Sequence, residues 1–395
     1  MKRISQIPFS PFLIAVLFIG GMQFSVNGPF RDLAALGPPP IPADNQQMVD
    51  ADGFPIATDP KVELGKILFY DNRLSGDASI SCADCHSDEF GWTDGSDLCR
   101  GYAGTSHWRN CQTLINSAYF AKLFWDGASK SLEAQAVSAA SGGVSGNGEK
   151  DMMEERLRQV PAYVERFKAV FGTKWPNLAD AWRAIAAYER TLIQTETPFD
   201  RYMRGDKSAL SEDEIAGMAL FEGKAQCIQC HDGALLTDEK YYNLGVPENP
   251  AFAEDASRQI TFRFEQYAKG VPEEIYRTTK TDLGLYYVTK RPEDMGKFRT
   301  PMLRYLLYSA PYMHNGAFYT LEEVVAFYNE GGGEDQITRN FGFGTKTDQI
   351  PALGLTQTEQ RQLVAFLEST SGEEIRSERP VLPEYGSMIL EEGDE

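Results

Sequence analysis

Cysteine and histidine are scarce in this chain of 395 residues, which contains only six of the first and four of the second. Basic residues are outnumbered as well: 38 Lys and Arg face 57 Asp and Glu, which gives a formal net charge of −19. This balance excludes nucleic acid as an expected partner, because the phosphate backbone attracts basic proteins. The negative charge favours either simple solubility or the steering of a positively charged partner.

Long apolar runs are rare too, and the one near the N-terminus is short for a membrane span. Lys2 and Arg3 precede the run PFLIAVLFIGGM at residues 11–22, a combination typical of an export signal. No clear small-x-small cleavage site follows, so an uncleaved anchor stays open as an alternative. We expect residues 1–28 to be a signal peptide or N-terminal anchor, and the protein to be periplasmic.

Strand-type alternation is confined to residues 258–290, where the segments ITFRF and LYYV predict a small hairpin. Helical signals dominate elsewhere. Asp59 and Pro60 are expected to start a helix, and Pro161 to interrupt the amphipathic stretch 149–170. Three capping boxes mark later helix starts, at Ser211/Glu214, Thr320/Glu323 and Thr356/Glu359.

The few cysteines and histidines are concentrated in two copies of one pattern. CADCH at residues 82–86 and CIQCH at residues 227–231 hold four of the six cysteines and two of the four histidines. Cys-x-x-Cys-His is the attachment signature of c-type haem. Each thiol can bond one haem vinyl group, and the adjacent imidazole then lies beneath the iron. The sequence therefore predicts two covalent haem c groups, one held by Cys82, Cys85 and His86 and the other by Cys227, Cys230 and His231.

Two other interpretations of these motifs are weaker. A zinc site would use both Cys-x-x-Cys pairs, but it gives no reason for a histidine directly after each. A thioredoxin-like redox pair belongs in a strand–turn–helix context, which the sequence lacks. Cys99 and Cys111 are left over, and in an oxidising compartment they predict a disulfide, with two free buried thiols as the alternative.

A faint internal repeat indicates two similar modules. GKILF at residues 65–69 precedes the first motif, and GMALF at residues 217–221 precedes the second. We therefore predict a mainly α fold of two tandem cytochrome c-like haem domains with little β structure. The expected division is a linker or arm at 29–58, haem domains at 59–205 and 206–375, and an acidic tail at 376–395.

Seven further motifs occur along the chain: LFYDNRLS (68–75), RN (109–110), FWDG (124–127), NLGVP (243–247), FRTPMLR (298–304), APYMHNGAF (310–318) and TLEEVVAFYN (320–329). With these motifs the chain resembles the bacterial di-haem cytochrome c peroxidase and MauG superfamily, from about Asp59 to Gly372. Several separate motifs in the same order are more specific than any one of them. In this family the N-terminal haem reacts with hydrogen peroxide, and the C-terminal haem stores or relays an electron.

The resemblance assigns roles to residues near the haems. Trp125 of FWDG would lie between the two haems and shorten each electron-transfer step. The sixth ligand of the second haem falls on Tyr328, fourteen residues after His314; a tyrosine there marks the MauG-like branch, whereas the peroxidases have methionine. A phenolate ligand lowers the haem potential, and a packed core tyrosine is the alternative. His314 itself would support the haem propionates or the inter-haem loop.

The resemblance also implies a calcium ion between the haems. Its protein ligands would be the Asn110 side chain and the backbone oxygens of Ser309 and Pro311. Amide and carbonyl oxygens suit a hard cation of this kind.

The reactive pocket departs from the family pattern. Gln135 matches the expected glutamine, but Ala139 stands in the place of a proline and Ser145 in the place of a proton-transferring glutamate. Serine cannot move protons in this way at neutral pH. Glu149, from a shifted backbone, and His107, from a preceding loop, are the candidates for that role.

Three functions are compatible with these features. The first is a MauG-like oxidase, which uses peroxide to form high-valent haem iron and oxidises a partner protein by long-range electron transfer through Trp125. The second is a cytochrome c peroxidase, which reduces hydrogen peroxide with electrons from a small cytochrome; Tyr328 argues against it. The third is a di-haem electron-transfer cytochrome without turnover, favoured by the missing glutamate. The expected partners are hydrogen peroxide and a protein substrate or redox protein.

Overall fold

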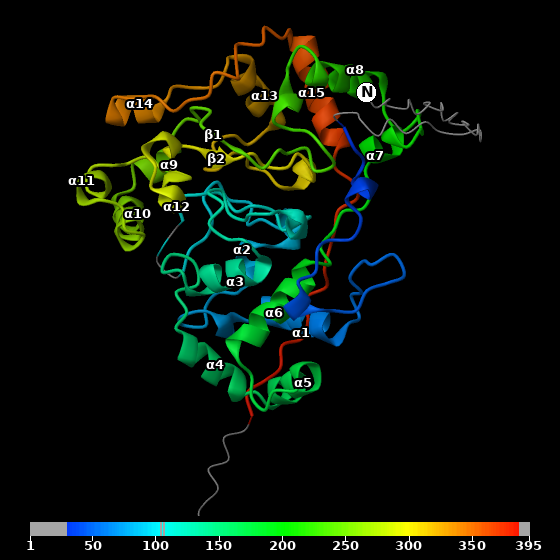
Figure 1. The fold of residues 1–395 in the computed structure, drawn as a ribbon, viewed down its shortest axis with the longest axis vertical. Helices are drawn as coiled ribbons and strands as arrows, with labels where there is room; N and C mark the ends of the chain where they lie inside the picture. The colour runs from blue at the N-terminus through cyan, green and yellow to red at the C-terminus, as the bar shows by residue number, and fades with distance from the viewer. Residues whose placement is uncertain (1–29, 103–104, 106, 387–395) are drawn as a thin grey trace, which may run out of the picture.

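The computed structural model describes residues 30–102, 105 and 107–386, so the predicted signal peptide or anchor at 1–28 lies outside the described residues. Helices dominate the described chain, whose strands form one two-stranded sheet. Figure 1 shows two lobes stacked along the long axis of the molecule. The predicted mainly α class is confirmed. Within these residues no helix is both long and apolar enough to cross a bilayer.

The first lobe is built on two packed helices, α1 (Pro60–Phe69) and α6 (Leu178–Glu189). The side chain of Asp59 caps α1, as predicted, by accepting a hydrogen bond from the Lys61 backbone. Pro161 begins a new helix because its ring cannot continue the preceding one. The remaining helices of this lobe are α2 (Cys82–Cys85), α3 (Leu132–Ser141), α4 (Lys150–Arg158) and α5 (Pro161–Phe171).

The second lobe repeats this plan with α8 (Glu212–Glu222) and α15 (Gln357–Ser369). All three predicted capping boxes are present with both hydrogen bonds formed, at the starts of α8, α13 and α15. The other helices of this lobe are α7 (Pro198–Met203), α13 (Leu321–Asn329) and α14 (Gln336–Phe341). Short 3-10 turns lie at Leu33–Leu36, Ala43–Asn45, Asn72–Leu74, Asp88–Phe90, Ser117–Tyr119, Cys227–Gln229, Pro292–Asp294 and Leu306–Tyr308.

A glycine marks the closest approach of the paired helices in each lobe. A Cβ atom on Gly65 would collide with the backbone carbonyl of Ala184 in α6, and one on Gly217 with that of Gln362 in α15. Two backbones can come this close only where one residue has no side chain. The repeat GKILF and GMALF is therefore the sequence trace of the same helix crossing.

The aromatic residue that ends each repeat packs in the same way. Phe69 meets Tyr188 edge-on with ring centroids 5.4 Å apart, and Phe221 meets Phe366 edge-on at 5.2 Å. The lobes are thus copies of one module. Their paired helices can be matched residue by residue, with Ala184 corresponding to Gln362 and Tyr188 to Phe366.

The N-terminal arm at 30–58 belongs to both lobes. Phe30 packs with Phe199 and Phe366 in the core of the second lobe. Farther along, the Asn45 side chain donates a 3.0 Å hydrogen bond to the Arg183 carbonyl in the first lobe. Because Phe199 is part of α7, this helix also packs with the second lobe.

The described C-terminal segment returns to the first lobe. Ile375 packs against the first core, and the Ser377 backbone donates a 2.8 Å hydrogen bond to Asp88. Figure 1 shows this segment running from the upper lobe toward α4 and α5. The two halves of the molecule are tied together at both ends of the chain.

The predicted hairpin at 258–290 is wrong, because this region is helical. Asp255 caps α10 (Ala256–Ala268) by accepting hydrogen bonds from two backbone groups of its first turn. The apolar residues of ITFRF lie on different sides of this helix. Phe262 is buried, whereas Ile260 and Phe264 are exposed. The neighbouring helices are α9 (Pro250–Ala253), α11 (Glu273–Tyr276) and α12 (Tyr286–Thr289), and the sheet pairs β1 (Tyr241–Tyr242) with β2 (Phe298–Arg299).

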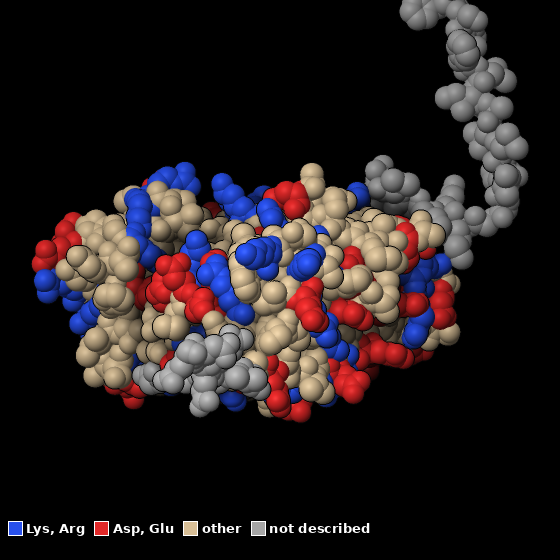
Figure 2. Space-filling view, turned by 90° about the horizontal axis from the view of Figure 1, so that it is seen from below, with Lys and Arg blue, Asp and Glu red and all other residues tan. Residues whose placement is uncertain are grey.

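Acidic and basic side chains are interspersed on the face drawn in Figure 2. The formal charge of −19 is therefore not gathered into one acidic patch on that face. Solubility is the role this distribution supports there.

Candidate functional site

A continuous cavity of about 660 Å³ connects the two lobes. Side chains of both Cys-x-x-Cys-His segments line it, together with the loops that contain Trp125 and His314. The structure therefore brings the two predicted haem sites into one shared space.

The first motif forms a single helical turn with its histidine at the end. Ser81 and Asp84 make a capping box that fixes α2, so Cys82 and Cys85 project from one turn. His86 follows as the C-cap, and its Nδ1 lies 3.0 Å from the Trp92 carbonyl oxygen. Burial lowers the pKa of His86. A neutral ring held through Nδ1–H leaves Nε2 free to bind iron.

The second motif repeats this arrangement. Cys227 and Cys230 lie on a 3-10 turn, and the Nδ1 of buried His231 lies 2.9 Å from the Leu236 carbonyl oxygen. Burial also lowers the pKa of His231. Both imidazoles are thus oriented by a backbone carbonyl, which is the usual support of a metal-bound histidine. The residues present fit two c-type haems.

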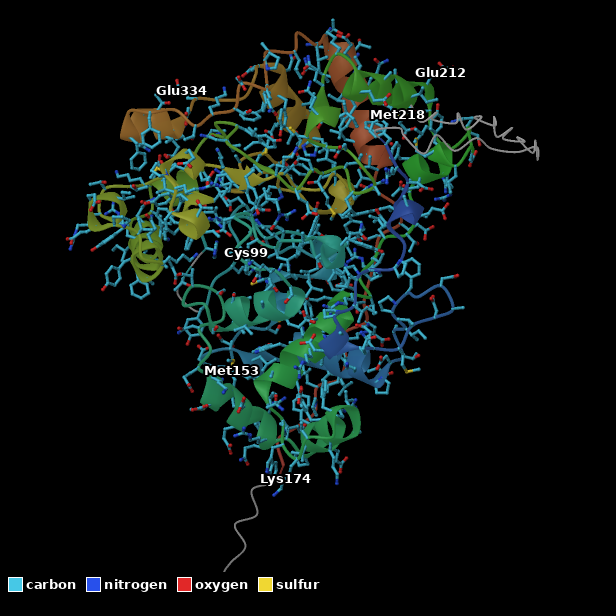
Figure 3. All side chains as sticks on the ribbon, in the orientation of Figure 1. Cys99, Met153, Lys174, Glu212, Met218 and Glu334 are labelled. Atoms are coloured by element: carbon cyan, nitrogen blue, oxygen red, sulfur yellow. A yellow bond between two sulfur atoms is a disulfide. The ribbon has the colours of Figure 1, made fainter. Side chains whose placement is uncertain are left out.

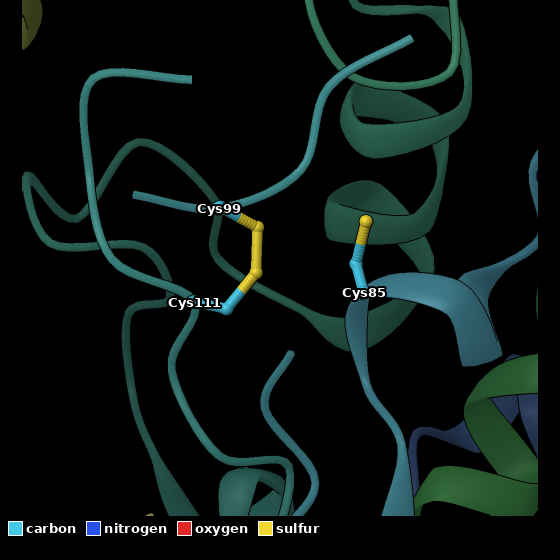
Figure 4. Close-up of side chains that lie close together, drawn as sticks. All are labelled: Cys85, Cys99 and Cys111. Atoms are coloured by element: carbon cyan, nitrogen blue, oxygen red, sulfur yellow. A yellow bond between two sulfur atoms is a disulfide. The ribbon is translucent and has the colours of Figure 1, made fainter. Parts of the chain in front are cut away.

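The zinc alternative is not supported. Among the described residues, the one group of Cys, His, Asp and Glu with metal-type spacing is Cys85 with Cys99 and Cys111, whose sulfur atoms lie within 4.8 Å of one another. Cys99 and Cys111 are joined in a disulfide, which confirms the predicted pairing. Figure 4 shows Cys85 beside that disulfide, and Figure 3 places Cys99 near the junction of the lobes. The disulfide therefore lies beside the expected first haem.

The loops that contain Trp125 and His314 are also related by the repeat. Each begins with an antiparallel bridge, Leu123 to Ser129 in the first lobe and Tyr312 to Phe318 in the second. A constant offset of 189 residues relates the two loops and the helices that follow, α3 and α13. Trp125 corresponds to His314, and their ring centroids lie 6.4 Å apart.

Trp125 is held rigidly at this junction. Its Nε1 donates a 3.0 Å hydrogen bond to the Asn110 carbonyl, and its own carbonyl accepts one from Arg299 at 2.8 Å. His314 stacks on Phe298 with ring centroids 3.6 Å apart. Burial lowers the pKa of His314 to about 4, so this ring is neutral at pH 7. A neutral, stacked ring is a packing element of the loop between the lobes.

A buried ion-pair network that sequence reasoning missed supports the same junction. Arg109 bonds Asp126, next to Trp125, at 2.8 Å and Asp282, in the second lobe, at 2.6 Å. All three side chains are less than a tenth exposed. The RN motif had indicated Arg109, but nothing in the sequence marked Asp282, which lies 173 residues away. The network ties the Trp125 loop to the other lobe.

Tyr328 lies in the part of the cavity that the second motif lines. Burial raises the pKa of its phenol, with the nearby Cys227 and Cys230 adding to the effect. Tyr328 is the eighth residue of α13, and the eighth residue of α3 is Ala139, which also faces the cavity. The two modules thus carry a potential oxygen ligand and a methyl group at corresponding places.

The predicted pocket residues of the first module fall into two groups. Gln135 and His107 line the cavity. Burial lowers the pKa of His107 to about 3, and its Nδ1 accepts a hydrogen bond from the Arg109 backbone at 3.0 Å. Ser145 also lines the cavity, but its hydroxyl donates to the Ala139 carbonyl at 2.7 Å. His107 can therefore donate a hydrogen bond through Nε2, but its Nδ1 is occupied.

Glu149 does not reach the cavity. It is exposed and caps α4 by accepting a hydrogen bond from the Met152 backbone at 2.9 Å. The structure instead places a different carboxyl in the cavity lining, that of Glu189 at the end of α6. No motif in the sequence identified Glu189.

The predicted calcium ligands lie in the same cavity. The Asn110 amide nitrogen donates to the carbonyls of Ser96 and Asp97, at 3.0 and 3.4 Å, which leaves its Oδ1 available. The backbone oxygens of Ser309 and Pro311 accept no hydrogen bond from the described residues. Three uncommitted oxygens in one cavity suit a hard cation.

Comparisons with known proteins agree with this geometry. A family model described as di-haem cytochrome c peroxidase matches residues 59–208. The cytochrome-c peroxidase IdrP1 of Denitromonas iodatirespirans is 53% identical and spans 90% of each chain, and the methylamine utilization protein MauG of Methylorubrum extorquens is 34% identical over 82% of each. The crystal structure of a MauG-like protein associated with microbial copper homeostasis matches with a TM-score of 0.68 and 27% identity, covering 89% of this chain and 96% of that one.

Proposed function

The chain belongs to the di-haem cytochrome c peroxidase family and is therefore a haem-dependent oxidoreductase with two haem c groups; from this premise, we propose that it reduces hydrogen peroxide at the first haem with electrons from a partner redox protein. The difference between Ala139 and Tyr328 carries the assignment of peroxide to the first haem. A methyl group cannot bind iron, so Ala139 would leave a coordination position open in the first module, whereas the phenol of Tyr328 would close the one in the second. An open iron suits reaction with peroxide, and a closed one suits electron relay.

The chain's own residues would divide the work between the modules. Haem supplies the redox chemistry when bound. His86 and His231 would hold the irons through Nε2, while the carbonyls of Trp92 and Leu236 keep those rings oriented. Trp125, fixed by its hydrogen bond to Asn110, provides an aromatic path between the modules.

Gln135 and His107 would bind the oxygen substrate in the first module. The Gln135 side chain makes no hydrogen bond with another described residue, so its amide is free for a ligand in the cavity. His107 offers an Nε2–H donor from a neutral ring. Two donors on one pocket orient a peroxide oxygen and help to keep it polarised.

Calcium would hold the junction between the modules. We place it at Asn110 Oδ1 and the backbone oxygens of Ser309 and Pro311. The Asn110 backbone also donates to the His314 carbonyl at 2.8 Å. A cation at Asn110 would thus fix the positions of Trp125 and His314 together, as ions of this kind order the loops that supply their ligands.

The name of one relative bears on the redox partner, and the cysteine chemistry bears on the compartment. The cytochrome-c peroxidase name of the relative at 53% identity supports a redox protein as electron donor. Haem c attachment and the disulfide both suit an oxidising compartment, so we place the mature chain in the periplasm, with residues 1–28 directing export.

A second candidate function is oxidation of residues in a partner protein, as the relationship to MauG allows. Tyr328 favours it, because an anionic oxygen ligand lowers the haem potential and makes the second haem a poor electron store. In this candidate the same path through Trp125 carries electrons from the partner's side chains.

Spectroscopy of the oxidised holoprotein followed by peroxide mixing tests the proposal. We expect one high-spin and one low-spin ferric haem by electron paramagnetic resonance, and rapid peroxide consumption with a reduced small cytochrome as donor. Two low-spin signals with no peroxide consumption would contradict the proposal and favour a simple carrier. A near-infrared band after peroxide, with slow cytochrome turnover, would favour the second candidate.

A further inference from the structure

Glu189 is a buried carboxyl that the site described above does not use. It is 4% exposed and lines the cavity, and its Oε2 has no hydrogen-bond partner among the described residues. It lies close to the first haem-attachment residue: after burial, the Glu189 carboxyl is the largest influence that raises the pKa of the Cys82 thiol. A buried, unpaired carboxyl is costly, so its position requires a reason.

The end of α6 is tied to the start of α3, which places Glu189 on the Gln135 side of the pocket. Arg190 Nη2 bonds Glu133 Oε1 at 2.8 Å, pairing the last turn of α6 with the first turn of α3. Ala186 and Leu132 pack together in the same region. Gln135 follows Leu132 by one turn of α3 and faces the same cavity.

Unpaired polar atoms gather in the segment that follows Glu189 and in the Asn116 loop that is hydrogen-bonded to it. Within the described residues, Ser117 Oγ, Asn116 Nδ2 and both side-chain ends of Gln194 are buried without partners, as are two nitrogens of Arg190. The Gln194 backbone bonds Asn116 Oδ1 at 3.0 Å, so these groups form one cluster. Buried polar atoms of this kind are commonly satisfied by ordered water. These atoms offer polar partners for ordered water beside the end of α6.

The charged groups around Glu189 leave its carboxyl protonated at neutral pH. Burial raises its pKa to about 8, Arg190 opposes this, and Glu133 of α3 adds to it. On α2, the titratable group near Glu189 is the Cys82 thiol, which becomes uncharged when it forms the thioether to haem. From α1, Lys61 lies within electrostatic range of Arg190. Only Arg190 therefore favours the ionised form directly, and burial outweighs it.

The second module lacks this carboxyl. Because Ala184 corresponds to Gln362 at the helix crossing, Glu189 corresponds to Leu367, which also lines the cavity and is 7% exposed. Leu367 is part of the second hydrophobic core. The same helix position is therefore apolar in the second module, where Tyr328 is the proposed iron ligand, and acidic in the first.

We propose that Glu189 holds and delivers the proton of the first haem pocket, in place of the glutamate that Ser145 replaces. The inference rests on the proposed function. Peroxide reduction joins one hydrogen peroxide, two electrons from the redox partner and two protons into two waters. Glu189 gives its carboxyl proton to the departing oxygen as the O–O bond breaks. It then takes a proton back from solvent on the side of Glu133, whose partly exposed carboxylate is bonded to Arg190.

Infrared difference spectroscopy of the ferric holoprotein provides the first test. The wild type should show the C=O band of a protonated carboxylic acid at pH 6, and this band should fade as the pH rises through about 8. The variant Glu189→Gln should lack the band, whereas the exposed control Glu149→Gln should keep it. A band that is absent from the wild type, or that survives in Glu189→Gln, would overturn the proposal.

Rapid mixing with peroxide gives the second readout. The wild-type rate should fall above pH 8, whereas Glu189→Gln should be slower by about 10²-fold at pH 7 and show no such fall. Glu189→Asp should recover part of the rate, because it restores an acid of shorter reach, and Glu149→Gln should match the wild type. Equal rates in Glu189→Gln and wild type would refute proton delivery by Glu189.

The two readouts separate this inference from the proposed function. A wild type that shows the pH-dependent carboxyl band but never consumes peroxide would refute the peroxidase function, while Glu189 would stand as the protonated group of the pocket. If Glu189→Gln does not accumulate as holoprotein, Glu189→Asp decides the matter through its own band and rate.

Discussion

Replacing Ala139 with tyrosine should close the first haem and convert it into a copy of the second. Ala139 and Tyr328 are each the eighth residue of their helices, and both face the cavity. The bridge that precedes each helix and the capping residue that starts it, Ser131 or Thr320, also correspond. A phenol introduced at 139 therefore starts from the same place, relative to its own haem, as the phenol of Tyr328.

The expected loss of peroxide reactivity follows from the fraction of molecules whose first haem keeps an open coordination position. If the new tyrosine favours the closed form by only about 1.4 kcal/mol, about one molecule in ten keeps an open position. The second-order rate constant for reaction with peroxide should then fall about tenfold or more, because only open molecules react. The high-spin ferric signal of the first haem should fall in the same proportion, which electron paramagnetic resonance measures alongside stopped-flow mixing.

Val137→Tyr is the matched control. Val137 lies on the same helix but is 44% exposed and does not line the cavity. Its tyrosine variant should keep the high-spin signal and the wild-type rate. An Ala139→Tyr protein that folds with both haems and still shows a full high-spin signal would refute the correspondence between the modules, and with it the argument for an open first haem.

Three further predictions concern the second haem and the stability of the fold. Tyr328→Met should raise the reduction potential of the second haem, because a thioether favours the reduced iron that a phenolate disfavours; an unchanged spectroelectrochemical titration would remove Tyr328 as a ligand. Gly65→Ala should destabilise the holoprotein by about 1–3 kcal/mol in denaturant unfolding, since its methyl group meets a backbone carbonyl, whereas Gly143→Ala, which meets only the end of a flexible side chain, should cost far less. Replacing both Cys99 and Cys111 with serine should cost about 2–4 kcal/mol for a loop that joins residues 12 apart, and an unchanged unfolding midpoint would contradict this.

Local signals in the sequence were sufficient to predict several helix starts and the two haem-attachment segments. Capping boxes, Pro161 and the haem motifs each act over a few residues, so their outcome depends little on the rest of the chain. The glycine of GKILF also encoded a contact between distant helices, because a helix interior has few other uses for glycine. The predicted fold class and the Cys99–Cys111 disulfide are confirmed for these reasons.

Features that depend on distant packing could not be predicted in the same way. ITFRF alternates apolar and polar residues, which predicted a strand. The segment is helical instead, and α10 exposes two of its apolar side chains, so alternation alone did not identify the buried face. Asp282 reaches Arg109 from 173 residues away. Glu149 and Glu189 look alike as letters in the sequence, and only burial separates the exposed helix cap from the carboxyl in the cavity.

The two modules show how one helical plan can support two chemistries. Their crossing glycines, edge-on aromatic pairs and carbonyl-held histidines correspond, so the scaffold that positions haem is the same in both. Two of the differences between corresponding side chains that line the cavity are Ala139 against Tyr328, and Glu189 against Leu367. In the functions proposed above, the first pair would decide whether iron has a free position, and the second would decide whether a proton is stored nearby. A free position without a nearby proton would bind peroxide but cleave it slowly, and a stored proton beside a closed iron would have no substrate. The proposed open iron and the buried acid therefore belong in the same module, which is the one that holds Ala139 and Glu189.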